Sequence, residues 1–203
     1  MKKDMREDTV DEFKARAAVR TLLQYIGENP NREGLLETPR RVVKAWDEMT
    51  SGYGQRASSV LSVDFHGNGY DEIVACPWIE FYSVCEHHML PFAGTAHVGY
   101  LPGKRVVGLS KLGRVVDIFA RRLQIQEQMT MQIADAIEDQ LKPRGVAVVI
   151  QAKHLCMACR GVQKRQSVMV TSAMRGVFRQ KDAARAEFFK LIELAQHSNG
   201  GVS

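Results

Sequence analysis

The sequence predicts an α+β fold with an antiparallel sheet. Apolar residues recur at helical spacing in several segments, while four other segments are rich in β-branched and aromatic residues, as strands are. Along the chain, the order is two helices, two strands, two helices, two strands and one helix. This order favours one α+β domain, and 203 residues are enough for such a domain with an N-terminal appendage.

Residues 1–70 are expected to form an N-terminal helical segment followed by a linker. Apolar residues at helical spacing predict an amphipathic helix over residues 10–26. Thr38, which a proline follows, is a suitable N-cap for a second helix, and Gly52 is expected to end that helix. Residues 53–70 are rich in glycine and serine and are therefore predicted to be a loop.

Residues 71–203 are expected to form the sheet domain. Residues 71–84 and 92–102 are apolar, aromatic and β-branched, so they are predicted to be the first strand pair. Ser110 is then expected to cap a helix that runs to residue 123.

The second half of this domain repeats the pattern. Apolar residues at four-residue steps predict a helix over residues 125–141. Residues 145–157 and 163–174 are predicted to be the second strand pair, and residues 182–196 the final helix.

Charge and composition narrow the classes of partner. The formal net charge of +5 and the pI near 9.1 suit an anionic partner. There is no long run of Lys or Arg and only 7% of residues are aromatic, so nucleic-acid binding is not expected. No apolar run approaches the roughly 20 residues of a membrane span, and the N-terminus lacks the apolar core of a signal peptide. We therefore expect a cytoplasmic protein without a membrane partner.

The sequence "SVCEHHML" places a thiol, a carboxylate and two imidazoles at four consecutive positions. In a continuous strand, Cys85 and His87 would point to one face, and Glu86 and His88 to the other. A metal held by Cys85 and His88 therefore requires the strand to end and turn there. His87 would then lie close to the metal and be free for another task.

A second group of metal-binding residues lies at the end of a later predicted strand, in "KHLCMAC". It contains His154, Cys156 and Cys159. If the two strand ends meet, three protein ligands leave room for a water, which is typical of catalytic zinc, and thiolates with imidazole favour zinc. A closed structural site with Cys85, His88, Cys156 and Cys159 is the alternative, and the spacing leaves it open.

Five motifs together resemble GTP cyclohydrolase I, in order over about residues 10–195. They are "NPNREGLLETPRRVVKAW", "SVCEHHMLPF", "GLSKLGRVVDIFARRLQIQEQMT", "KHLCMACRGV" and "TSAMRGVF". The resemblance implies conversion of GTP and water to 7,8-dihydroneopterin triphosphate and formate, which leads to folate and tetrahydropterin. It also implies that residues 71–203 form a tunnelling-fold catalytic domain, whose sheets join into a barrel in a homodecamer of two pentamers.

The resemblance also assigns roles to individual residues. It implies that Zn²⁺ is bound by Cys85, His88 and Cys156, with His87 and His154 as catalytic imidazoles. The substrate-binding residues that it implies are Glu127 and Gln126 for the nucleoside, and Ser110, Lys111, Arg114, Arg160, Arg41 and Lys44 for the triphosphate. Within this scheme we expect His154 to protonate the purine N7 and His87 to shuttle protons. Cys159 departs from the family pattern, and we expect a small buried thiol, because a fourth thiolate would take the position of the water.

Two other classes of function are weighed against this enzyme. A zinc-stabilised module that binds a purine or pterin without catalysis would keep Glu127 but would need neither His87 nor His154. Other tunnelling-fold enzymes, such as relatives of pterin synthases or nitrile reductases, lack the combined CEHH and HxC pattern. Because both histidines and both motifs are present, the sequence favours the cyclohydrolase.

Overall fold

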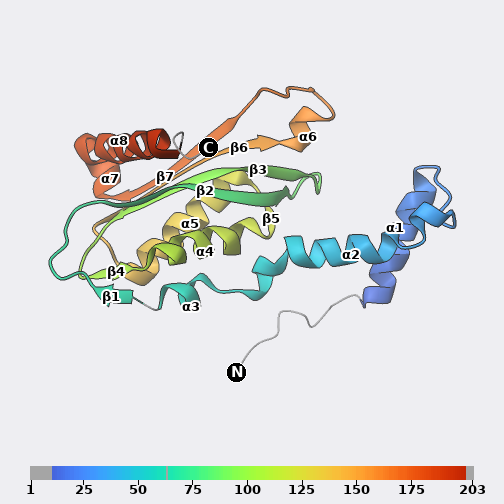
Figure 1. The fold of residues 1–203 in the computed structure, drawn as a ribbon, viewed down its shortest axis with the longest axis horizontal. Helices are drawn as coiled ribbons and strands as arrows, with labels where there is room; N and C mark the ends of the chain where they lie inside the picture. The colour runs from blue at the N-terminus through green and yellow to red at the C-terminus, as the bar shows by residue number, and fades with distance from the viewer. Residues whose placement is uncertain (1–10, 63, 200–203) are drawn as a thin grey trace. The chain divides into compact units, whose positions relative to one another are not determined.

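The computed structural model describes residues 11–62 and 64–199 as a mixture of helices and sheets (Figure 1). The mixed α+β class predicted from the sequence is confirmed. The chain divides into two compact units, one ending at Thr50 and the other beginning at Ser51. The division at residue 70 expected from the sequence stays a prediction.

The first unit consists of two helices and a short 3-10 turn: α1 (Glu12–Tyr25), η1 (Glu33–Leu35) and α2 (Thr38–Met49). Two predicted details were wrong. Thr38 is the first residue of α2 and Glu37 is the N-cap, and the helix ends before Gly52. The proline after Thr38 still lies in the first turn, where its missing N–H costs no helical hydrogen bond. Neither α1 nor α2 contains a buried residue.

The second unit is built on a five-stranded sheet in the order β5-β2-β3-β6-β7. The four long strands, which pair antiparallel as predicted, are β2 (Val74–Cys85), β3 (Pro91–Leu101), β6 (Gly145–His154) and β7 (Met169–Gly176). The fifth strand, β5 (Leu123–Gln124), is short and runs parallel to the end of β2. This edge strand was not expected from the sequence.

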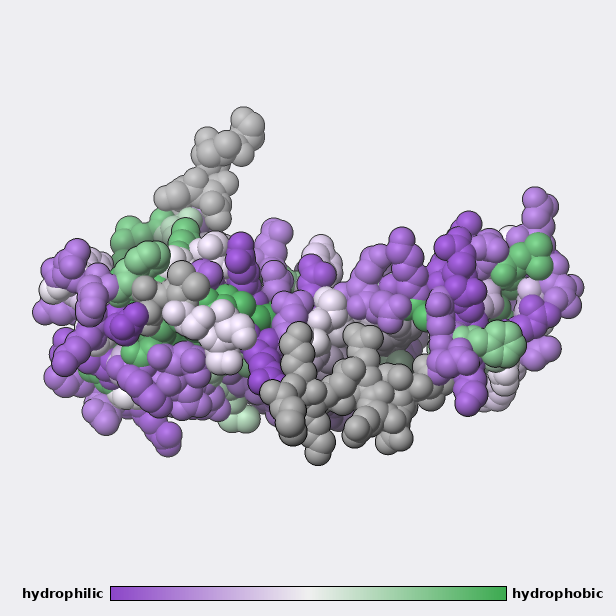
Figure 2. All heavy atoms as spheres, turned by 90° about the horizontal axis from the view of Figure 1, so that it is seen from below, coloured by the Kyte–Doolittle hydropathy of each residue, from purple (hydrophilic) through white to green (hydrophobic). Residues whose placement is uncertain are grey.

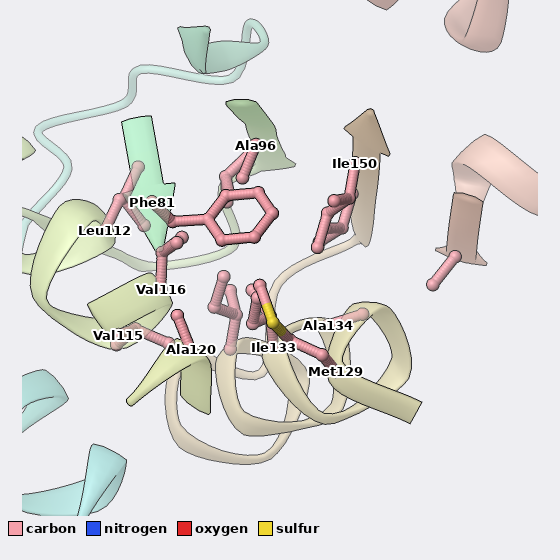
Figure 3. Packing of buried hydrophobic residues seen from close by; sticks show 14 of the residues in the cluster. Phe81, Ala96, Leu112, Val115, Val116, Ala120, Met129, Ile133, Ala134 and Ile150 are labelled. Atoms are coloured by element: carbon pink, nitrogen blue, oxygen red, sulfur yellow. The ribbon is translucent and has the colours of Figure 1, made fainter. Parts of the chain in front are cut away.

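Helices cover both faces of this sheet (Figure 1). One face is covered by α4 (Leu109–Ala120) and α5 (Gln126–Leu141), and the other by α7 (Val177–Gln180) and α8 (Asp182–Asn199). Figure 3 shows Phe81 of β2 between the sheet and side chains such as Val116 of α4 and Ile133 of α5. These residues are at most 2% exposed, so burial of apolar surface fixes both helices on the sheet.

The segment predicted to be a linker loop contains regular structure. It begins with η2 (Ser51–Gly54), followed by α3 (Ala57–Leu61) and β1 (Asp64–His66). Strand β1 pairs with β4 (Arg105–Val107) in a separate two-stranded sheet. Burial explains α3, because Ala57 and Leu61 lie one helical turn apart and both pack into the main core.

The start of α4 also differs from the expectation. Gly108 is the N-cap and Leu109 the first helical residue, so Ser110 lies in the first turn and does not cap the helix. Gly108 has no side chain, so the first N–H groups of α4 receive no capping hydrogen bond from the N-cap residue.

The exposed face shown in Figure 2 is mostly hydrophilic, and apolar residues form small separate groups on it. Among the described residues, no helix combines the length and apolar character needed to cross a bilayer.

Substitution of Gly94 in β3, compared with substitution of Gly113 in α4, tests the pairing of β3 with β6. A Cβ on Gly94 would lie 1.9 Å from the carbonyl oxygen of Gln151, whereas one on Gly113 in α4 would meet nothing within 4 Å. Gly94→Ala is expected to lower the free energy of unfolding by about 1 to 3 kcal/mol, as overpacking does. Gly113→Ala, the matched control, should leave stability unchanged or raise it by up to about 1 kcal/mol. Urea unfolding followed by circular dichroism measures both; equal stability of the two variants would contradict the tight pairing.

Candidate active site

The candidate site lies where three segments of the second unit meet. Strand β2 ends at Cys85, and the chain turns back so that Cys85 N–H donates to the carbonyl of Leu90 (2.9 Å) and Met89 N–H donates to that of Cys85 (2.8 Å). Met89 has a φ of 54°, which closes this turn. The strand therefore ends and turns at the CEHH sequence, as a metal held by Cys85 and His88 requires.

Register brings the second predicted cluster to the same end of the sheet. Strand β3 lies between β2 and β6, with Ser83 opposite Phe92 and Phe92 opposite His154. The helical turn α6 (Leu155–Ala158) follows at once and carries Cys156. The two strand ends therefore meet, as expected from the sequence.

Three of the predicted ligands form one cluster. The ligand atoms of Cys85, His88 and Cys156 all lie within 4.8 Å of one another, and Cys85 Sγ is 4.0 Å from His88 Nδ1. A tetrahedral ion with bonds of about 2.3 Å to sulfur and 2.0 Å to nitrogen places its ligand atoms roughly 3.5 to 3.8 Å apart. Small side-chain movements would close this difference, so the donor set fits a metal ion.

Cys159 is not part of this cluster. Its side chain is exposed, so the expectation of a buried thiol was wrong. It is the C-cap of α6, and its N–H donates to the carbonyl of Leu155. The geometry therefore favours three protein ligands over the closed site with three cysteines and one histidine.

The environment of Cys156 couples metal binding to proton release. Burial raises the pKa of the Cys156 thiol, the nearby Cys85 thiol raises it further, and Arg160 opposes the shift. The protonated thiol is therefore favoured when no metal ion is bound. A metal ion that binds the thiolate has to displace this proton, which makes affinity rise with pH.

His154 lies beside the metal cluster and is held on two sides. Its ring stacks on Phe92, with the centroids 4.4 Å apart and the planes 6° from parallel. Its Nε2 lies 2.8 Å from Oε1 of Gln126, which is only 1% exposed. Burial lowers the pKa of His154, and the carboxylate of Glu127 opposes this shift. His154 is thus a well-positioned imidazole whose neutral form is favoured.

Strand β5 explains why helix α5 begins at this site. Gln124 pairs with Cys85, and the carbonyl of Gln124 accepts a hydrogen bond from Glu86 N–H (3.1 Å). Because α5 starts two residues later, Gln126 and Glu127 are brought near the metal cluster. Glu127 itself is exposed in the first turn of the helix.

The other catalytic candidate, His87, is exposed in the turn between β2 and β3. Its side chain is 62% accessible, its Nε2 is 4.0 Å from Glu86, and its ring centroid is 6.3 Å from that of His88. His87 is therefore outside the ligand cluster and open to solvent within the described chain.

The predicted triphosphate ligands come from several places. Ser110, Lys111 and Arg114 lie in the first two turns of α4, and Arg160 follows α6 closely enough to act on Cys156. Arg41 and Lys44 belong to α2 of the first unit, where Lys44 is 3.9 Å from Glu48. The second unit alone thus combines the metal cluster, His154, Glu127 and Arg160.

Sequence reasoning missed Phe92, which fixes the plane of the His154 ring. The "LPF" after the CEHH sequence shows only that an aromatic residue follows the turn. Phe92 lies opposite His154 because of the register between β3 and β6, and the sequence alone does not reveal this register.

Sequence comparisons with a family model and with curated proteins agree on one family. Residues 15–193 match the family model described as GTP cyclohydrolase I. GTP cyclohydrolase 1 of Campylobacter jejuni serotype O:6 is 54% identical over 178 residues, which cover 88% of this chain and 94% of that protein. GTP cyclohydrolase 1 of Deinococcus radiodurans is 55% identical over 174 residues, covering 86% and 81% respectively. The one from Wolinella succinogenes is 54% identical over 170 residues, covering 84% and 91%.

The three-ligand cluster predicts which cysteines control metal content. Cys85→Ser, His88→Ala and Cys156→Ser should each lose most of the bound metal, because each removes one ligand of three. Cys159→Ser is the matched control and should keep the full amount, since its thiol lies outside the cluster. Elemental analysis of the purified variants decides the question. Metal loss in the Cys159 variant would favour the closed four-ligand site.

Proposed function

Because the chain belongs to the GTP cyclohydrolase I family, we propose that Cys85, His88 and Cys156 hold a zinc ion in its active site. As a member of this family, the chain is an enzyme that converts GTP and water to 7,8-dihydroneopterin triphosphate and formate, in folate and tetrahydropterin biosynthesis. The single observation that supports the proposed zinc site is the convergence of the three ligands beside His154.

The donor set supports zinc as the metal. Two thiolates and one imidazole are softer ligands than magnesium or calcium prefers. When bound with three protein ligands, zinc activates a water molecule as a nucleophile near neutral pH.

The two remaining histidines are proposed to move protons. The addition of water to C8 of guanine needs a proton at N7, and His154 is the held imidazole next to the ligands. His87 is exposed in the adjacent turn, where it can exchange protons with solvent and serve the later steps, including opening of the ribose ring.

Glu127 is proposed to select guanine. Guanine presents N1–H and the 2-amino group as neighbouring donors, which a single carboxylate accepts together. The exposed carboxylate of Glu127 is close enough to His154 to affect its pKa, so the base would lie beside the catalytic imidazole. Adenine lacks this donor pair, and we therefore expect ATP to be rejected.

The triphosphate is proposed to bind at the start of α4. The N-terminus of this helix carries no side-chain cap, and its N–H groups suit phosphate oxygens. Further ligands that we propose for the triphosphate are Ser110, Lys111, Arg114, Arg160, Arg41 and Lys44. Arg and Lys supply charge-assisted hydrogen bonds to phosphate.

The sheet is proposed to be of the tunnelling-fold type and to continue into neighbouring subunits. Strand β7 is at one edge, and Val170 on it is 63% exposed. Open apolar edges favour pairing with another chain. We propose a homodecamer of two pentamers with active sites between subunits.

Turnover of GTP tests the assigned histidines. The wild type is expected to release formate from GTP and to yield a pterin that fluoresces after oxidation. His87→Ala and His154→Ala should keep the metal and lose roughly 10²- to 10⁴-fold in kcat, the usual contribution of general acid–base catalysis. Formate release and metal content are measured on the same samples. Near wild-type turnover by both variants would refute the proton-transfer roles.

A mixing experiment tests whether sites are shared between subunits. Cys85→Ser and Arg114→Ala should each lose most of the activity, because one lacks the metal and the other lacks a proposed triphosphate ligand that lies away from the metal cluster of its own chain. When the two are unfolded and refolded together, mixed oligomers should regain part of the activity. Light scattering follows assembly, and refolding each variant alone is the control. A fully active monomer would contradict the shared site.

A further inference from the structure

Gln126 is a buried polar side chain next to the candidate active site, and all of its hydrogen bonds are internal. It is the first residue of α5 and is 1% exposed. The two hydrogens on its Nε2 are shared among three acceptors, the carbonyls of Ile150 and Met169 and Oγ1 of Thr171, each at 3.1 Å from the nitrogen. These three acceptors belong to β6 and β7, so the sheet holds the amide nitrogen in place.

The same contacts decide which way the amide faces. Two of the acceptors are main-chain carbonyls, which cannot donate, so an amide oxygen in that position would face two carbonyl oxygens without a hydrogen between them. The oxygen Oε1 therefore points the other way, toward His154, whose Nε2 is 2.8 Å distant. An acceptor oxygen at that distance requires Nε2 of His154 to carry a hydrogen.

The orientation of the ring leaves one nitrogen for chemistry. The stacking on Phe92 fixes the plane of the ring, and the bond to Gln126 fixes its rotation in that plane. In the part of the chain that the structure describes, Nδ1 of His154 makes no hydrogen bond. With Nε2–H committed to Gln126, Nδ1 is the nitrogen that can exchange a proton with a bound molecule.

We infer that Gln126 is a positioning residue that holds His154 with a hydrogen on Nε2 and presents Nδ1 to the purine. This role rests on the proposed function. Nδ1 of the neutral ring first takes up a proton from solvent. In the transfer step this Nδ1–H bond breaks and its electron pair stays on Nδ1, while the N7 lone pair of the purine forms the new N–H bond. The direct contact of Gln126 with the base carbonyl or ribose, which the sequence suggested, stays a prediction.

Thr130 offers a control variant that keeps the hydrogen bond between Gln126 and His154. Thr130 Oγ1 donates to the main-chain carbonyl of Gln126 (2.7 Å) and lies 2.7 Å from Oγ1 of Thr171. Thr130 is 1% exposed and has no contact with His154 in this network. Thr130→Val therefore removes buried hydrogen bonds next to Gln126 without removing the acceptor for Nε2–H.

The experiment compares two variants with the wild type in formate release from GTP, with kcat and KM measured separately. Gln126→Met should lower kcat by roughly tenfold to a hundredfold, as partial loss of general acid catalysis predicts, while KM for GTP and zinc content stay near wild type. Thr130→Val should keep the wild-type kcat.

Each outcome decides the inference. An unchanged kcat in Gln126→Met would overturn it, because Gln126 would then have no role in the reaction. A change in KM alone would indicate contact with the substrate instead, and an equal loss of kcat in Thr130→Val would indicate a merely structural role. If Gln126→Met fails to fold by circular dichroism, Gln126→Asn, whose shorter side chain withdraws the acceptor, takes its place with the same expected result. Absence of formate release by the wild type would instead refute the proposed function.

Discussion

The hydrogen bonding of β3 to β2 on one side and to β6 on the other is the constraint on which the site depends. It places Ser83, Phe92 and His154 in one row across the sheet, so that the ends of β2 and β6 lie together. Side chains alternate between the faces of a strand, so a slip of one residue would turn the His154 ring to the opposite face. The close approach at Gly94, where no Cβ fits, holds this register two residues from Phe92.

Much of this arrangement could be predicted because it follows from local sequence patterns, namely the periodicity of apolar residues and the spacing of metal-binding residues. The four long strands and the helices between them have clear periodicity, and they were expected in the observed order. Cys85 and His88 at C-x-x-H spacing require a turn at the strand end, and the structure has that turn. The inclusion of Cys156 in the ligand cluster depends on pairing between distant strands, and for this residue the family resemblance supplied what spacing left open.

The remaining features could not be predicted because they depend on tertiary contacts. The helix α3 lies in a Gly- and Ser-rich segment that has no helical periodicity of apolar residues. It forms because Ala57 and Leu61 are buried in the main core. The thiol of Cys159 was expected to be buried, but α6 ends at this residue and leaves it at the surface. The internal bonds of Gln126 arise from two strands that lie 24 or more positions away in sequence.

The site therefore combines groups of two physical kinds. Gln126 and His154 are held by hydrogen bonds and stacking within the chain, so their orientation is fixed before any substrate arrives. Such preorganised groups need no rearrangement when charge develops in the reaction, and this is where fixed dipoles contribute most to catalysis. Glu127 and His87 are exposed instead, and they stay accessible to a ligand. The division suits a large, charged nucleotide, because the fixed pair keeps one orientation for proton transfer while the exposed side chains can adjust to the ligand.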